Sequence, residues 1–107
     1  MAQAVSSQAQ IDAATASGLA VLDVWAPWCA PCKMMEPVLA QLEHSYGDQI
    51  HFLKLNVDDH QALAEQYKVM SVPSLVIFKQ GKAAEKVAGY YPEDKLRRYL
   101  DAKLMEL

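Results

Sequence analysis

The chain has 107 residues and a mass of 11.9 kDa, which is enough for one hydrophobic core but not for two. Hydrophobic residues make up 52% of it and charged residues 21%, so a disordered or fibrous chain is excluded. Asp and Glu number 13 against 10 Lys and Arg, which gives a net charge of -3. Proteins that bind the phosphate backbone need a basic excess. We therefore expect a single domain spanning residues 1–107 with no nucleic-acid partner.

The N-terminal segment does not have the pattern of a signal peptide or of a membrane span. Residues 1–18 contain no Lys or Arg and no apolar run long enough for a signal peptide or a membrane span. We expect a cytoplasmic, monomeric protein that is complete from Met1 and has no membrane partner.

The first predicted elements are a helix and a strand. Segment 6–17 has apolar residues at helical spacing and ends before Gly18, a common helix-stop residue. Leu19–Trp25 (LAVLDVW) is a nearly continuous apolar run, typical of a strand buried on both faces of a parallel sheet, with Asp23 as its one carboxylate. A further strand at Ala2–Val5 is only weakly indicated, because Ala and Gln are poor strand formers.

The middle of the chain continues this alternation. After Trp28, apolar residues recur at helical intervals as far as Tyr46, which predicts a helix with Cys29 at its start. Ile50–Asn56 (IHFLKLN) predicts a second buried strand. Asp58–Tyr67 predicts a helix, since acidic residues suit the positive end of a helix dipole.

The C-terminal part predicts a hairpin followed by a helix. Leu75–Phe78 and Lys82–Ala88 are two strand-like runs, and the turn signal Gln80-Gly81 between them is short enough to force a hairpin. Pro92–Leu104 places leucines on one face of a final helix. The order αβαβα followed by ββα predicts parallel crossovers first and an antiparallel hairpin second.

The two cysteines form a CxxC motif. Secreted disulfide scaffolds of this size use four or more cysteines, so Cys29 and Cys32 are not expected to staple the fold. A bridge across so short a loop contributes at most about 2 kcal/mol and is easily reversed. The alternative is a zinc site, which would have to recruit two of the three histidines, His44, His51 and His60.

The position of the motif at a strand-to-helix junction predicts redox chemistry. Residues three apart on a helix face the same side, which suits disulfide geometry. The unpaired amides and positive dipole end at a helix N-terminus favour a thiolate, so Cys29 is the predicted nucleophile. Cys32, one turn deeper, is expected to be less exposed and to resolve the mixed disulfide.

Asp23 is the candidate acid/base. In a strand buried on both faces an unpaired carboxylate tends to remain protonated, and such a group near Cys32 can exchange a proton with the thiol. The alternative is an ordinary carboxylate in a salt bridge. Lys54 interrupts the next strand in a similar way and is the candidate partner of Asp23, although it could equally be a snorkelling surface lysine.

The sequence resembles the thioredoxin family from Leu19 to Leu104. The motif WCAPCK is similar to the family pattern WCGPCK, with Ala30 in place of glycine. Further positions match in register, and they are Asp23, Pro37, Lys54, Val72-Pro73, Gly81 and Gly89.

The resemblance implies an α/β protein with the thioredoxin fold: a central mixed β-sheet of four to five strands flanked by helices on both faces, with a C-terminal ββα unit. It also implies reduction of disulfides in client proteins and recycling by a thioredoxin reductase. The implied redox group is the Cys29–Cys32 disulfide itself, with no bound cofactor and no metal.

The resemblance also implies a docking surface for clients. The bond before Pro73 is expected to be cis and to present backbone groups to an extended client strand. The motif and groove residues are expected to be Trp28, Ala30, Pro31, Val72, Pro73 and Gly89; Met70 fits this surface and core packing equally well. Two alternatives remain: a binding module in which redox turnover is incidental, and a disulfide oxidant or isomerase.

Overall fold

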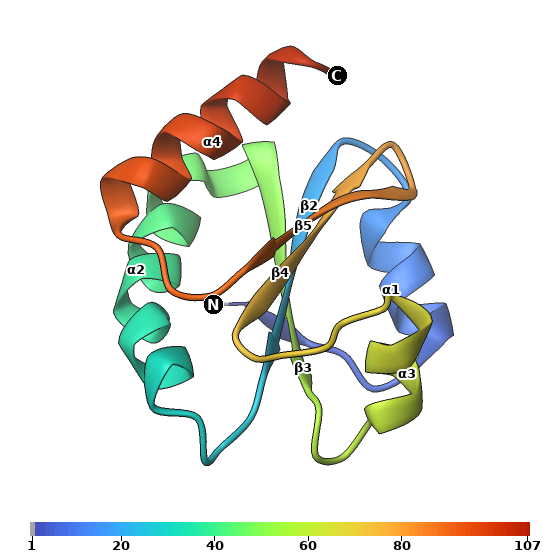
Figure 1. Ribbon diagram of the computed structural model, residues 1–107. Coiled ribbons are helices and arrows are strands. Elements are labelled where there is room, and N and C mark those ends of the chain that lie inside the picture. The colour runs from blue at the N-terminus through green and yellow to red at the C-terminus, as the bar shows by residue number, and fades with distance from the viewer. Residues whose placement is uncertain (1) are drawn as a thin grey trace.

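A five-stranded sheet forms the centre of the computed structural model, which describes residues 2–107. Helices lie on both of its faces (Figure 1). The elements in chain order are β1 (Gln3–Ala4), α1 (Gln8–Thr15), β2 (Leu19–Trp25), α2 (Ala30–Tyr46), the 3-10 turn η1 (Gly47–Gln49), β3 (Ile50–Asn56), α3 (Gln61–Gln66), β4 (Ser74–Lys79), β5 (Lys82–Ala88) and α4 (Glu93–Met105).

The sheet is mixed, as predicted. Its strand order is β1-β3-β2-β4-β5, with β1 and β2 parallel to β3, and β4 antiparallel to both β2 and β5. The weakly indicated first strand does form, although it is only 2 residues long. It pairs with Leu53 and Lys54, and the Val5 amide continues the ladder by donating to the Lys54 carbonyl at 2.9 Å.

The central strand β2 divides the interior into two cores. Leu19 and Val21 pack with α2 and α4, whereas Leu22 and Val24 belong to the core on the α1 and α3 side. Figure 1 shows α2 with α4 on one face and α1 with α3 on the other. Because side chains alternate along a strand, Asp23 lies on the same face as Leu19 and Val21, toward α2.

The predicted start of α3 is wrong. The helix begins at Gln61, and Asp58 lies in the turn before it. The Asn56 side chain holds this turn, since its Oδ1 accepts from the Asp58 amide at 3.0 Å, and the His60 amide donates to the Val57 carbonyl at 3.3 Å. Asp58 and Asp59, whose acidic side chains are typical of a helix start, therefore lie in the turn and not in the helix.

The β4–β5 hairpin turns at Gln80 and Gly81, as predicted. Both residues have positive φ, 50° and 87°, which is the requirement of a tight hairpin turn whose twist matches the strands. Gln80 also joins the turn to the start of β2: its amide donates to the Gly18 carbonyl at 2.9 Å, and its side-chain oxygen accepts from the Gly18 amide at 2.8 Å.

Tyr46 connects the two helices of one face. Its hydroxyl lies 2.7 Å from Asp101 Oδ1 and 3.0 Å from the Arg97 carbonyl oxygen, both on α4. The ring is buried in the core between the helices and the sheet. The hydroxyl therefore ties the end of α2 to α4.

We expect Tyr46→Phe to lower the free energy of unfolding by about 1–3 kcal/mol, because it removes a part-buried hydrogen bond to a charged acceptor. Urea titration measures this change. Tyr90→Phe is the matched control, since the Tyr90 hydroxyl makes no hydrogen bond within residues 2–107. Equal effects of the two substitutions would show that the α2–α4 bond has no stabilising role.

Candidate active site

Cys29 and Cys32 form a disulfide at the N-terminus of α2. Their Cα atoms are 5.3 Å apart. Cys29 is the N-cap residue with an extended backbone, and its Sγ accepts a hydrogen bond from the Cys32 amide at 3.2 Å. An amide at a helix N-terminus that points at sulfur stabilises a thiolate there. The geometry supports Cys29 as the sulfur that carries negative charge in the reduced protein.

The expected difference in exposure between the cysteines is wrong for the disulfide form. Cys29 is 4% exposed and Cys32 5%, and both belong to one small apolar cluster with Ala26. Both cysteines of the disulfide lie in this cluster, against which Val57 and Val72 pack. What distinguishes the two cysteines is therefore the capping hydrogen bond of Cys29, not its exposure.

The other motif residues either begin helix α2 or lie exposed beside the disulfide. Ala30 is the first residue of α2 and Pro31 follows it, in the first turn, where a missing amide hydrogen breaks no helical bond. Trp28 is 70% exposed, and its indole nitrogen donates to Asp58 Oδ1 at 3.0 Å. This bond fixes a large apolar ring at the rim of the site.

The segment before β4 completes the rim. The Val72–Pro73 peptide bond is cis, as the resemblance implied. The Pro73 carbonyl accepts from the Gly89 amide at 2.8 Å, and Gly89 has φ +96°, a conformation that L side chains rarely adopt. Val72 packs against the cysteine cluster, while Met70 is 92% exposed, so the core alternative for Met70 is wrong.

Asp23 has the raised pKa that its place in the strand predicts. The residue is 8% exposed, and burial raises the pKa of its carboxyl to about 7. The charge of Lys54 opposes this rise in pKa, and the charge of Glu36 adds to it. Both protonation states of Asp23 are therefore populated near neutral pH.

Lys54 lies directly opposite Asp23 in the β2–β3 register, on the same face of the sheet. Its ammonium nitrogen is not bonded to the carboxylate: it sits over the Trp25 ring, 4.9 Å from the centroid. Within residues 2–107 no ion pair joins the two groups. Lys54 thus acts on Asp23 through space, and Trp25 packs under Lys54.

A cavity of about 200 Å³ adjoins Asp23 between β3 and α2. Asp23 makes no hydrogen bond within residues 2–107, yet no fully buried side-chain oxygen or nitrogen in that range lacks a partner. The carboxyl oxygens of Asp23 are therefore not fully buried, and they open on this cavity. Glu36, Lys54 and Glu43 also line it. Sequence reasoning missed Glu36, although its spacing of four residues after Cys32 places it on the same helix face.

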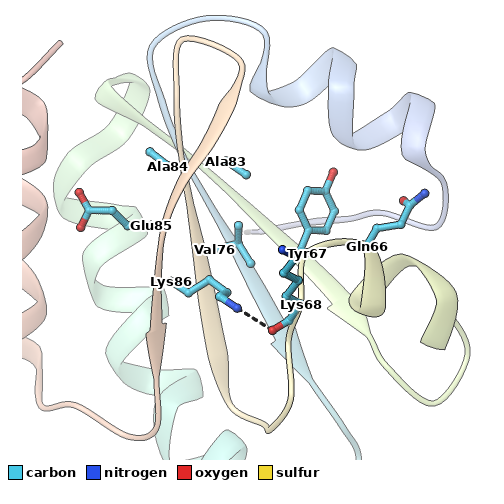
Figure 2. Close-up of a pocket in the computed structure, with 8 residues that line it drawn as sticks. All are labelled: Gln66, Tyr67, Lys68, Val76, Ala83, Ala84, Glu85 and Lys86. Atoms are coloured by element: carbon cyan, nitrogen blue, oxygen red, sulfur yellow. Dashed lines mark hydrogen bonds between the residues drawn. The ribbon is translucent and has the colours of Figure 1, made fainter.

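A second hollow lies elsewhere and contains none of the predicted site residues. Figure 2 shows it beside the end of α3, with Tyr67 and Lys68 on one side and residues of β5 on the other. Lys86 reaches across it, and its ammonium donates to the Lys68 carbonyl at 2.6 Å.

The described residues contain no cluster of three or more His, Cys, Asp or Glu side chains that could hold a metal ion. None of the helices in residues 2–107 is long and apolar enough to cross a membrane.

Comparison with known proteins agrees with this geometry. The family model Thioredoxin matches residues 3–102. The chain belongs to the thioredoxin family. A thioredoxin of Staphylococcus aureus is 42% identical over 98 residues, which is 92% of this chain and 94% of the relative.

Solved structures extend the comparison. The thioredoxin of Malassezia sympodialis has a TM-score of 0.86 at 32% identity, over 95% of this chain and 90% of that one. A mutant thioredoxin from Halobacterium salinarum has a TM-score of 0.86 at 36% identity, over 94% of this chain and 88% of that one. The protein is a thioredoxin-fold protein-disulfide oxidoreductase whose redox group is the Cys29–Cys32 disulfide.

The raised pKa of Asp23 makes the stability of this thioredoxin-family chain depend on pH. The folded-state pKa, about 7, lies above the ordinary value of 3.8, so the fold loses stability as the pH rises between these values. Asp23→Asn removes the titration. We expect its effect on the free energy of unfolding to be more favourable at pH 8 than at pH 4, by on the order of 3 kcal/mol.

The measurement is a pair of denaturant titrations of the oxidised protein and the variant at the two pH values. An Asn variant whose relative stability is the same at pH 4 and pH 8 would contradict the raised pKa.

Neutralising Glu36 should lower the pKa of Asp23, because one of the two charges that act on the carboxyl across the cavity is then gone. Carbon-detected NMR titration of the Asp23 carboxyl in Glu36→Gln measures this shift. Asp48→Asn is the control, because it removes the same charge from the turn η1, away from the cavity. An unchanged Asp23 pKa in Glu36→Gln would remove Glu36 from the site.

Proposed function

We propose that residues 1–107 form a single cytoplasmic, monomeric domain that reduces disulfides in client proteins and is recycled by a thioredoxin reductase. No bound cofactor takes part, since the cysteine pair itself carries the electrons. The observation that carries the proposal is the Cys29–Cys32 disulfide at the N-terminus of α2, with the titratable carboxyl of Asp23 on the strand that leads to it.

The reaction consumes the reduced dithiol. The Cys29 thiolate attacks one sulfur of the client disulfide, forms a mixed disulfide and expels the other client sulfur as a thiolate, which takes up a proton. The Cys32 thiolate then attacks the Cys29 sulfur, releases the second client thiol and leaves the Cys29–Cys32 disulfide. Two electrons pass to the client, and the reductase returns two electrons and two protons.

Asp23 is the proposed proton acceptor for Cys32. The thiol must lose its proton to attack, and a base is most effective when its pKa lies near the working pH. A pKa of about 7 meets this condition, whereas an unperturbed aspartate would be too weak a base. Lys54 supports the role by lowering the cost of the charged form.

The rim offers a place for an extended client segment. Within residues 2–107 no hydrogen bond involves the backbone of Val72, which therefore remains free to pair with a client strand. Trp28 adds an exposed apolar side chain beside it, and the Pro73 carbonyl and the Gly89 amide are joined by a hydrogen bond behind it. Backbone pairing gives affinity with little side-chain selectivity, which suits many different clients.

Insulin reduction in the presence of dithiothreitol tests the reductase activity. If the unaltered protein reduced insulin no faster than a Cys29→Ser variant, the binding-module alternative would be favoured. A protein that oxidises reduced clients faster than it reduces disulfides would favour the oxidant or isomerase alternative.

The order of the two sulfurs predicts which variant captures clients. Cys32→Ser should retain clients on Cys29 as mixed disulfides, because the resolving sulfur is absent, while Cys29→Ser should retain few or none. Non-reducing electrophoresis of the variants incubated with a disulfide-containing protein measures this difference. Equal capture by both variants would overturn the assignment of roles.

A further inference from the structure

A groove of about 270 Å³ runs from the redox site along one side of α3. Its floor is apolar, and its rim includes the exposed side chains of Trp28 and Met70. The lining residues of the floor are Val57, Ala64, Val69 and Val72. Since Val72 also packs on the cysteine cluster, the groove is continuous with the redox site.

Two carboxylates line this groove, Asp58 and Glu65, and no Lys or Arg of the described residues does. Asp58 uses Oδ1 to accept the Trp28 indole hydrogen, and its Oδ2 accepts no hydrogen bond within residues 2–107. Glu65 is exposed, and its side chain forms no ion pair there either. Both negative charges are therefore available to a bound molecule.

The lysines nearby, Lys68 and Lys86, line the second hollow and not the groove. Lys68 has φ +57° and lines the second hollow, where Lys86 binds its carbonyl (Figure 2). Lys68, just after α3, and Lys86, on β5, thus lie at the hollow that contains no predicted site residue, whereas Asp58 and Glu65 lie at the groove beside the disulfide. The two charged side chains that line the groove are therefore both acidic.

We infer that this groove selects client segments that carry a lysine or arginine close to the reacting cysteine. The client's apolar and backbone atoms lie on the floor, and its cation faces Asp58 and Glu65. The inference rests on the proposed reductase function and names the class of client that the site prefers. Opposite charges at a solvent-exposed surface act on association more than on chemistry, and salt screens them.

The test uses three disulfide peptides that are identical except for Lys, Gln or Glu at one position, with that position moved stepwise along both sides of the cysteine. Oxidation of the reduced protein in a single turnover, followed by tryptophan fluorescence, gives the second-order rate constant. At the best position we expect Lys to exceed Glu by about 3- to 10-fold at low salt, and the ratio to approach one in about 0.5 M NaCl.

Glu65→Lys and Asp48→Lys form a matched pair of variants. Each changes the net charge by the same amount, but Asp48 lies in η1, before β3, and does not line the groove. Glu65→Lys should abolish or invert the preference for the Lys peptide, while Asp48→Lys should retain it. Equal rates for the three peptides at every position, or an equal loss of preference in both variants, would overturn the inference.

The Gln peptide separates this inference from the proposed function. If the reduced protein fails to react even with the Gln peptide, the reductase function itself is wrong. If it reacts with all three peptides at one rate, the reductase function stands and the charge selection is wrong.

Discussion

The burial of β2 on both faces is the constraint on which the redox site depends. Its neighbour β3 pairs with it from Leu19 to Trp25 and its neighbour β4 from Leu19 to Val24, and separate cores cover its two sides. A shift of one residue would exchange the side chains between the cores, so the register is firmly fixed. The fixed register also fixes where the chain leaves the sheet, at Trp25. Five residues later α2 begins at Ala30, with Cys29 as its N-cap.

The same constraint gathers three distant segments at one edge of the sheet. The parallel strands β2 and β3 both end there, and the Val57 amide donates to the Trp25 carbonyl at 2.9 Å to join the segments that follow them. The antiparallel β4 begins at this edge, directly after Pro73. Ligand sites of α/β proteins form at such an edge, because loops from separate strands converge on it.

Much of the fold could be predicted because its signals are local. The apolar run of β2, the turn Gln80-Gly81 and the helical spacing after Trp28 each indicate one structure. The start of α3 could not be predicted, since Asp58 has the residue type of a helix start and its partner Trp28 is brought to it only by the tertiary fold.

The site divides in the same way. Cys29, Cys32 and Asp23 could be identified because a CxxC motif and a carboxylate within an apolar strand are unusual patterns. Glu36 and Glu65 have the pattern of ordinary exposed helix residues, and only the cavity and the groove that they line distinguish them. The sequence also left open which face Lys54 occupies, because that depends on strand register.

The placement of Lys54 explains how Asp23 titrates near neutrality. A direct ion pair with a lysine holds the pKa of an aspartate below its usual range, and the carboxylate would then be a poor base at any physiological pH. Burial without any cation would raise the pKa further and keep the group protonated. The Lys54 ammonium lies over the Trp25 ring and makes no ion pair with Asp23 within residues 2–107, so burial raises the pKa of Asp23 to about 7 against the opposing charge of Lys54. Burial therefore outweighs the attraction of the Lys54 charge, and the Asp23 carboxyl can take up or release a proton near neutral pH.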